Sequence, residues 1–223
     1  GLITDLIVDG EISGSESELT LIHTSNSVYP DLKASRVLIA GLGSSDRIDT
    51  NAIRRVSATV IRKLREVGVK KFATIVHGAG IGGVDVSSSA QSLVEGSLLG
   101  AYRFLKYRTT DTKRKPDVES MVIVESDSSK LTAIGAAIKK GVTYSNAEIL
   151  ARDLVNEPAN KLSPANLASV ALKVANDNGL QCEVLDEADV SALGMGAYTG
   201  VAQGSSRPLK FIHMSYLGDS SNL

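Results

Sequence analysis

The feature that most constrains the fold is a close succession of strand, helix and strand in the first half of the chain. Arg36–Ala40, RVLIA, predicts a buried strand, and Lys71–His77, KFATIVH, predicts a second one. Between them, Asp49 or Thr50 can cap a helix, and Gly68 suits the position just beyond its end. This order and spacing predict a βαβ unit, in which the two strands lie in a largely parallel sheet.

Apolar residues at helical spacing predict the faces of two helices in this half. The first helix should bury Ile53, Val56, Val60, Leu64 and Val67, and the second should bury Ala90, Leu93, Val94, Leu98, Ala101 and Leu105. Residues 1–35 are polar and acidic apart from an expected strand. That strand is predicted at Leu19–His23. Three later strands are predicted at Met121–Glu125, Gln181–Leu185 and Leu209–Leu217.

The rest of the chain indicates a second α/β part. Helices are predicted over Lys130–Lys140, along a segment ending near Asn156, over Pro164–Asn176, and from a cap at Asp186 to Gly194. Gly141 is expected to kink or end its helix, so the domain boundary is placed there. The first domain is then 1–140, a complete α/β unit, and 141–223 is the incomplete start of another.

Composition limits the classes of function. The 223 residues carry a net charge of −1, which provides no field to attract nucleic acid or an acidic membrane. Cys182 is the single cysteine, so no disulfide can form within the chain. No apolar run reaches the ~20 residues that span a bilayer, and no basic segment precedes an apolar one at the N-terminus. We therefore expect a cytoplasmic protein, processed or trimmed because an initial Met is missing.

The segment Gly78–Gly83 matches G-x-G-x-x-G between a predicted strand and a predicted helix. In a dinucleotide site, such glycines let the backbone approach a pyrophosphate at a helix N-terminus. The acidic residue expected about 20 positions later is missing, and Glu125 lies too far along the chain. A tight turn between strand and helix is the favoured interpretation, and nucleotide binding is the alternative.

Two groups of basic residues raise the possibility of nucleic-acid binding. They are Arg54, Arg55, Arg62, Lys63, Arg65, Lys70 and Lys71 in the first group, and Lys113, Arg114 and Lys115 in the second. No aromatic residues alternate with them, as a protein that binds single strands would need. A solvated helix face and a charged loop are the favoured interpretation.

No catalytic or metal-binding constellation is predicted. His23, His77 and His213 are far apart in sequence, and Gly204-Ser205-Ser206 is expected to be a turn rather than a nucleophile site. Cys182 is expected to be buried and inert, and His213 to be an ordinary strand residue. Asp153 and Glu157 form a carboxylate pair, but at a helix end they are expected to bind backbone or Arg152. We assign no catalytic, cofactor-binding or metal-ligating residue.

The segment around residue 155 joins the two predicted parts. Its apolar residues recur on one helix face, which comprises Ala147, Leu150, Ala151, Leu154 and Val155. We expect Leu154 to anchor this helix in an apolar interface. Pro158 disfavours a helical Glu157, so the helix should end near Asn156. Ser163 and Pro164 then suit the N-cap and first position of the next helix.

Three segments resemble the leucine aminopeptidase (cytosol aminopeptidase) family. ARDLVNEPAN at Ala151–Asn160, followed by KLSPANLA, is similar to the segment joining that family's two domains. VEGSLLGAYRFLKYRT at Val94–Thr109 resembles a helix of its N-terminal domain. LGMGAYTGVAQGS at Leu193–Ser205 resembles the entry to its catalytic domain.

The resemblance implies an α/β fold: a macro-domain-like N-terminal unit and the first part of a metallopeptidase domain. Members remove N-terminal amino acids from peptides, bind two divalent metal ions, zinc or manganese, and form hexamers. Their metal ligands lie in motifs resembling GKGVTFDSGG and NTDAEGR, and neither motif occurs in this sequence. The resemblance therefore transfers no functional residue, and we expect the chain alone to be inactive. A macro-like module that binds ADP-ribose or nucleotide, and a DNA-binding side role, are the alternatives.

Overall fold

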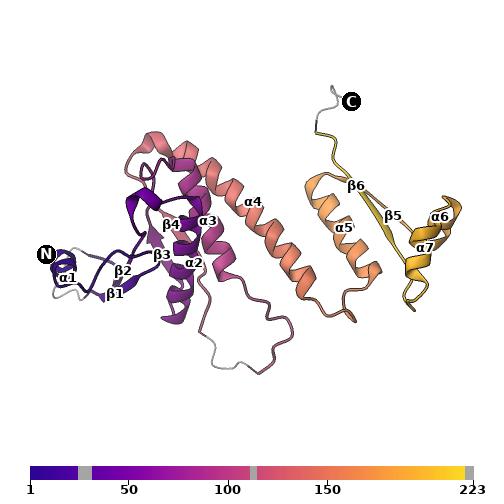
Figure 1. The fold of residues 1–223 in the computed structure, drawn as a ribbon, viewed down its shortest axis with the longest axis horizontal. Coiled ribbons are helices and arrows are strands. Elements are labelled where there is room, and N and C mark those ends of the chain that lie inside the picture. The colour runs from indigo at the N-terminus through magenta and orange to yellow at the C-terminus, as the bar shows by residue number, and fades with distance from the viewer. Residues whose placement is uncertain (25–31, 111–114, 219–223) are drawn as a thin grey trace. The chain divides into compact units, whose positions relative to one another are not determined.

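The computed structural model describes residues 1–24, 32–110 and 115–218. Its helices and strands form two compact units, Gly1–Ala151 and Arg152–Leu223. Both units are mixtures of helices and short strands, as the ribbon in Figure 1 shows. The predicted α/β class is therefore confirmed, and we call the two parts unit 1 and unit 2.

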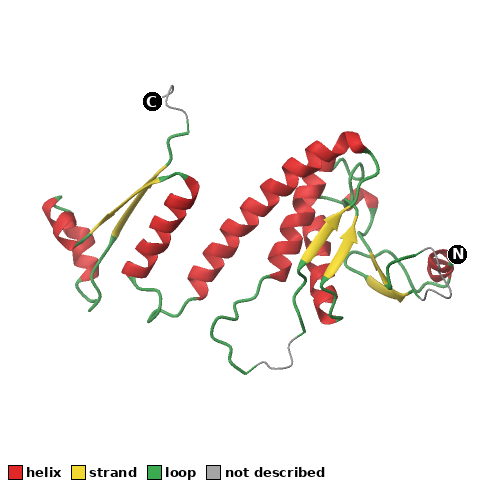
Figure 2. Cartoon of the chain, turned by 180° about the vertical axis from the view of Figure 1, so that it is seen from behind, coloured by secondary structure: helices red, strands yellow, loops and turns green. Residues whose placement is uncertain are grey.

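Among the described residues, unit 1 contains four α-helices and two pairs of strands. In chain order its elements are α1 (Leu2–Val8), β1 (Leu19–His23), β2 (Arg36–Ala40), α2 (Thr50–Glu66), β3 (Lys71–Thr74), α3 (Val86–Ala101), β4 (Ser120–Ile123) and α4 (Leu131–Asn156), the last of which continues into unit 2. β1 pairs with β2 in antiparallel fashion, and β3 pairs with β4 in parallel (Figure 2). α1 corrects the prediction that residues 1–35 are polar apart from one strand, because the mostly apolar segment Leu2–Val8, LITDLIV, forms a helix.

The parallel pair is not the one that the sequence predicted. β2 and β3 were expected to pair across α2, but among the described residues β2 pairs with β1 and β3 pairs with β4. The crossover helix is therefore α3, which is long enough to connect two parallel strands. β2 is half-buried along its length rather than buried. β3 and β4 end at Thr74 and Ile123, where their pairing ends, and so are shorter than predicted.

The ends of α2 agree with the prediction from its capping residues. The side chain of Asp49 accepts a hydrogen bond from the amide of Ala52 at 2.6 Å. At the other end, Gly68 has a φ of +74°, the left-handed conformation that glycine tolerates best. The buried part of the predicted face contains Ile53, Val56 and Leu64, all at most 5% exposed, whereas Val60 and Val67 are half-buried.

α2 and α3 pack together unusually closely because α3 carries glycines at the contact. A Cβ atom added to Gly96 would lie 2.3 Å from the carbonyl oxygen of Arg54, and one added to Gly100 would lie 2.5 Å from the Cα of Ala58. The backbones therefore approach at a distance that no other residue allows. Of the predicted α3 face, Ala90, Leu93 and Val94 are buried, Leu98 and Ala101 are half-buried, and Leu105 lies beyond the end of the helix.

α4 runs without interruption through Gly141, so the prediction that this glycine kinks or ends the helix is wrong. Gly141 is buried, and a Cβ atom there would lie 3.2 Å from the Cβ of Val94 on α3. Close packing against α3 therefore explains the glycine. The compact units divide between Ala151 and Arg152, later along the helix than the boundary expected at Gly141.

The predicted apolar face at the C-terminal end of α4 is only partly buried. Leu150 and Leu154 are half-buried, Ala147 and Ala151 are exposed, and Val155 is 83% exposed. The helix does end at Asn156, as the following Pro158 predicts.

Unit 2 consists of helices on either side of an antiparallel strand pair. Its elements are α5 (Pro164–Asn178), β5 (Gln181–Leu185), α6 (Glu187–Ala192), α7 (Gly196–Ala202) and β6 (Phe211–Ser215). α5 lies on one side of β5 and β6, and α6 and α7 lie on the other (Figure 1). The expected parallel arrangement is not present here, since Val184 of β5 is paired with Ile212 of β6 in antiparallel register.

The capping signals predicted at Ser163 and Asp186 are confirmed in unit 2. Ser163 accepts a hydrogen bond from the amide of Asn166, Gly179 ends α5 with a φ of +68°, and Asp186 forms a capping box with Asp189 at the start of α6. α7 was not predicted; it is held by the hydroxyl of Tyr198, which donates to the carbonyl of Lys210 at 2.8 Å.

The contact between α2 and α3 predicts opposite effects for two glycine substitutions. Gly96→Ala forces a methyl group into the backbone of α2, and overpacking of this kind costs about 1–3 kcal/mol of unfolding free energy. The matched control is Gly135→Ala in α4, where a Cβ meets nothing within 4 Å and helix propensity should add up to about 1 kcal/mol. Urea unfolding measures both, and equal effects of the two substitutions would contradict the close packing.

Candidate functional site

The glycine loop that follows β3 is a compact turn closed by its own backbone. Gly78, Gly80, Gly82 and Gly83 all have φ between +60° and +81°. The amide of Gly80 donates to the carbonyl of Val84 at 2.9 Å, which closes the loop on itself. A Cβ atom at Gly82 would lie 2.4 Å from the carbonyl oxygen of Ile48. The backbone conformation and packing of the turn therefore explain these glycines, and no bound ligand is needed to explain them.

A carboxylate occupies the N-terminus of α3, where a dinucleotide site would hold its pyrophosphate. One oxygen of Asp85 accepts hydrogen bonds from the amides of Ser87 and Ser88 at 2.8 and 2.9 Å, and the other accepts from the hydroxyl of Ser88 at 2.6 Å. These hydrogen bonds lower the pKa of Asp85, and the bond from the Ser88 hydroxyl has the largest effect. The group is thus negatively charged at neutral pH and uses the donors that a phosphate would need. The interpretation as a tight turn is supported.

Glu125, the distant acidic residue considered for this loop, is engaged locally. It accepts a hydrogen bond from the amide of Asp127 at 2.9 Å, and that bond is the main cause of its lowered pKa. It therefore stabilises the turn before α4.

His77 lies at the start of the glycine loop and is partly buried. Its Nε2 atom is 3.1 Å from the hydroxyl of Thr74. Burial lowers the pKa of His77, because removing the imidazolium from water is unfavourable. The ring is therefore neutral near pH 7 and is a hydrogen-bonding partner of the strand end.

The other residues weighed as candidates do not converge. His23 is exposed on β1. On β6, the Nδ1 atom of His213 lies 4.0 Å from the Oε2 atom of Glu183, its cross-strand partner on β5. Cys182 is half-buried rather than buried. The hydroxyl of Ser205 accepts a hydrogen bond from the amide of Arg207, which fits the predicted turn.

Within residues 1–24, 32–110 and 115–218, no three His, Cys, Asp or Glu side chains lie close enough to hold a metal ion. The donor set of the described chain thus does not fit a divalent metal, which prefers several converging oxygen or imidazole ligands.

Carboxylates compensate much of the first basic group. Arg54 pairs with Glu95 at 2.6 Å, Arg55 with Glu16 at 2.6 Å, Lys63 with Glu66 at 3.1 Å and Lys70 with Glu119 at 3.0 Å. These pairs neutralise four of the seven basic residues, and the interpretation as a solvated helix face stays a prediction. In the second group, Lys113 and Arg114 lie outside the described residues, and Lys115 donates to the carbonyl of Glu66.

The segment between α4 and α5 is held as a defined turn. The amides of Lys161 and Leu162 both donate to the carbonyl of Pro158, at 2.8 and 3.0 Å. The guanidinium of Arg207 donates to the carbonyl of Asn160 at 3.2 Å. This is the segment that carries the clearest family motif, and its geometry is fixed within unit 2.

Sequence comparison defines the class of protein. The family model described as "Cytosol aminopeptidase family, N-terminal domain" matches residues 1–111, and the model of the same family's catalytic domain matches residues 149–222. This chain belongs to the cytosol aminopeptidase family, and the predicted resemblance is confirmed.

Individual relatives agree. A probable cytosol aminopeptidase of Solibacter usitatus is 38% identical over 95% of this chain and 41% of the relative, and one of Alkaliphilus oremlandii is 31% identical over the whole chain and 44% of the relative. The chain thus spans less than half the length of these relatives.

Solved structures share the fold. The bottromycin maturation enzyme BotP in complex with Mn superposes with a TM-score of 0.79 at 23% identity, covering 96% of this chain and 42% of BotP. A mutant of tomato leucine aminopeptidase gives a TM-score of 0.76 at 24% identity, covering 96% of this chain and 41% of that protein.

In the part of the chain that the structure describes, no helix is both long and apolar enough to span a membrane.

The capped N-terminus of α3 predicts that the glycine loop does not bind nucleotides. ADP-ribose or NAD, added at increasing concentration, should leave the thermal unfolding midpoint unchanged, because the Asp85 carboxylate repels a diphosphate. A midpoint that rises with ligand concentration, and no longer does so in Gly82→Ala, would instead support the nucleotide-binding alternative.

Burial of His77 predicts a component of stability that depends on pH. Its folded pKa lies below the unfolded value of about 6.5, so the unfolded state binds the proton more readily and stability falls as pH drops below about 6.5. His77→Gln should flatten this part of the stability profile, measured by urea unfolding from pH 7.5 to 5. His23→Gln, at an exposed imidazole, is the control and should leave the profile in place.

Proposed function

We propose that this chain is the N-terminal domain and the opening part of the catalytic domain of a metal-dependent aminopeptidase. The whole enzyme would release N-terminal amino acids, leucine among them, from peptides. The observation that carries the proposal is the order of the two family matches, the N-terminal domain over residues 1–111 and then the catalytic domain over residues 149–222. Relatives of both matched parts are named aminopeptidases.

Five of the described carboxylates have structural roles, which supports an inactive chain. Asp49, Asp85 and Asp186 cap helices. Glu95 and Glu16 pair with arginines between elements of unit 1. Hydrolysis of a peptide needs an activated water, and an acid–base pair or a metal site must provide it. None of these five carboxylates is placed with others to do so.

Metal dependence is part of the proposal for the whole enzyme. Two divalent ions, zinc or manganese, would activate the water and polarise the scissile carbonyl. The presence of Mn in the BotP complex supports a divalent ion in this fold. The described residues do not supply a ligand set, so we derive no step of the reaction from them.

Three further properties belong to the same proposal. The whole enzyme would be cytoplasmic and would assemble as a hexamer, to which the N-terminal domain would contribute. The N-terminal domain would comprise residues 1–140, with the catalytic domain beginning near Gly141. Size-exclusion chromatography with light scattering tests the assembly, and limited proteolysis followed by mass measurement tests the boundary.

We expect the purified 223-residue chain not to hydrolyse leucine p-nitroanilide, even with added zinc or manganese. The full-length protein should hydrolyse it and should lose that activity to a chelator. Intact mass of the sample excludes contaminating full-length enzyme. Metal-dependent turnover by the short chain would contradict the proposal and would direct attention to His23, His77 and His213.

A further inference from the structure

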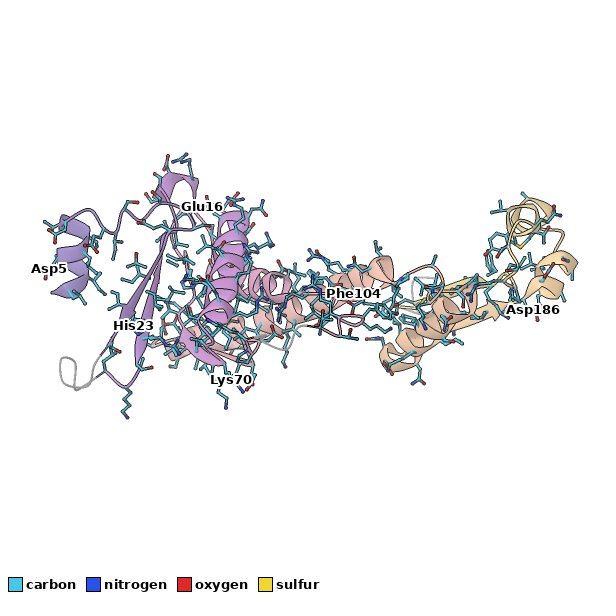
Figure 3. The ribbon with its side chains drawn as sticks, turned by 90° about the horizontal axis from the view of Figure 1, so that it is seen from below. Asp5, Glu16, His23, Lys70, Phe104 and Asp186 are labelled. Carbon is cyan, nitrogen blue, oxygen red and sulfur yellow. The ribbon has the colours of Figure 1, made fainter. Side chains whose placement is uncertain are left out.

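A polar cavity lies in unit 1 between two loops, residues 13–16 before β1 and residues 42–47 after β2. Its volume is about 680 Å³, within the range of about 300–1,000 Å³ that small-molecule sites occupy. The wall includes Ser13, Glu16, Ser44, Arg47 and Arg55, with Leu42 as its one large apolar side chain. Figure 3 shows Glu16 beside helix α2, which contributes Arg55. Such a wall suits a charged, water-soluble ligand.

The two loops are joined to each other by their backbones, so the cavity has a fixed frame. The amide of Gly43 donates to the carbonyl of Gly14, and the amide of Ser17 donates to the carbonyl of Gly41, both at 3.0 Å. A Cβ atom at Gly41 would lie 2.1 Å from the carbonyl oxygen of Ser15, so only glycine permits this approach. A site that is already ordered loses less entropy when a ligand binds.

The charged side chains on the wall are an ion pair, Arg55 with Glu16, and a separate arginine, Arg47. Arg55 donates to both oxygens of Glu16, at 2.6 and 3.2 Å. That contact is the main cause of the lowered pKa of Glu16, so the carboxylate is ionised. Arg47, in contrast, forms no ion pair with any residue that the structure describes, although it lies close enough to affect Glu16 electrostatically. The wall therefore offers one guanidinium available to a ligand and one carboxylate.

The carboxylate also limits what the ligand can be. A phosphate or other dianion would gain from Arg47 and Arg55 but would be repelled by Glu16. A ligand with a single negative group and a separate positive group gains from both parts of the wall. Each oxygen of Glu16 can accept more than one hydrogen bond, so the pair with Arg55 leaves acceptor capacity for an ammonium group.

We propose that this cavity binds a free α-amino acid as its zwitterion, with the ligand carboxylate on Arg47 and the ligand ammonium on Glu16. A planar guanidinium matches a carboxylate with two parallel hydrogen bonds, which gives Arg47 its role. Amino acids of this kind are also the products of the proposed aminopeptidase. The recognition itself does not depend on hydrolysis, so binding can be tested on a chain that has no activity.

The test is calorimetric titration of the 223-residue chain with four probes. L-leucine should bind saturably. N-acetyl-L-leucine lacks the ammonium group and L-leucinamide lacks the carboxylate, so each should bind about tenfold or more weakly, as expected when a charged hydrogen-bond partner is removed. Inorganic phosphate should compete poorly with leucine, because Glu16 faces the same cavity.

Two variants separate the site from general charge effects. Arg47→Gln should weaken leucine binding about tenfold or more, whereas Arg62→Gln, which removes the same charge from an exposed position on α2 outside the cavity, should have no effect. Unchanged thermal midpoints verify that both variants fold.

Four outcomes would overturn the proposal: no saturable binding of leucine, equal binding of leucinamide, phosphate binding as tight as leucine, or equal losses in the two variants. If Arg47→Gln does not fold, the comparison of leucine with leucinamide on the parent chain still decides. Peptidase activity of the full-length protein is a separate measurement, so failure here leaves the proposed function standing.

Discussion

The packing of α2 against α3 is the contact on which unit 1 depends. Gly96 and Gly100 let the two backbones meet, and Arg54 and Glu95 then form an ion pair across the same surface. The Glu95 side chain is only 8% exposed, and a buried carboxylate is unfavourable unless it is paired. Gln91 donates to its other oxygen at 2.7 Å, so each oxygen of Glu95 accepts a hydrogen bond. Close backbone contact and a satisfied buried charge thus occur together.

The position of α3 determines the rest of unit 1. As the crossover between β3 and β4, it sets their parallel pairing, and its capped N-terminus closes the glycine loop. Its other side receives α4, where Gly141 packs next to Val94. The loop that looks like a nucleotide fingerprint is therefore part of the connection into this helix, and its glycines satisfy the geometry of that connection.

Acidic side chains serve structure throughout the described chain, which bears on function. Asp85 and Asp186 cap helices, and Glu16 forms an ion pair with Arg55, so these carboxylates have structural roles. The chain belongs to the cytosol aminopeptidase family, and the carboxylates named above stabilise its fold. The exception is the polar cavity, where Arg47 is available to a ligand.

Features that depend on neighbouring residues could be predicted from the sequence alone. Ser163 and Asp186 were predicted as caps, and Asp49 as one of two candidates, because a cap bonds to amides two or three positions away. The family could also be recognised, since motifs such as that at Ala151–Asn160 are contiguous. The pairing of the strands, the position of Gly141 inside a helix and the contact between Arg55 and Glu16 became clear only from the three-dimensional structure. Each of these depends on contacts between distant residues, whose partners no local pattern specifies.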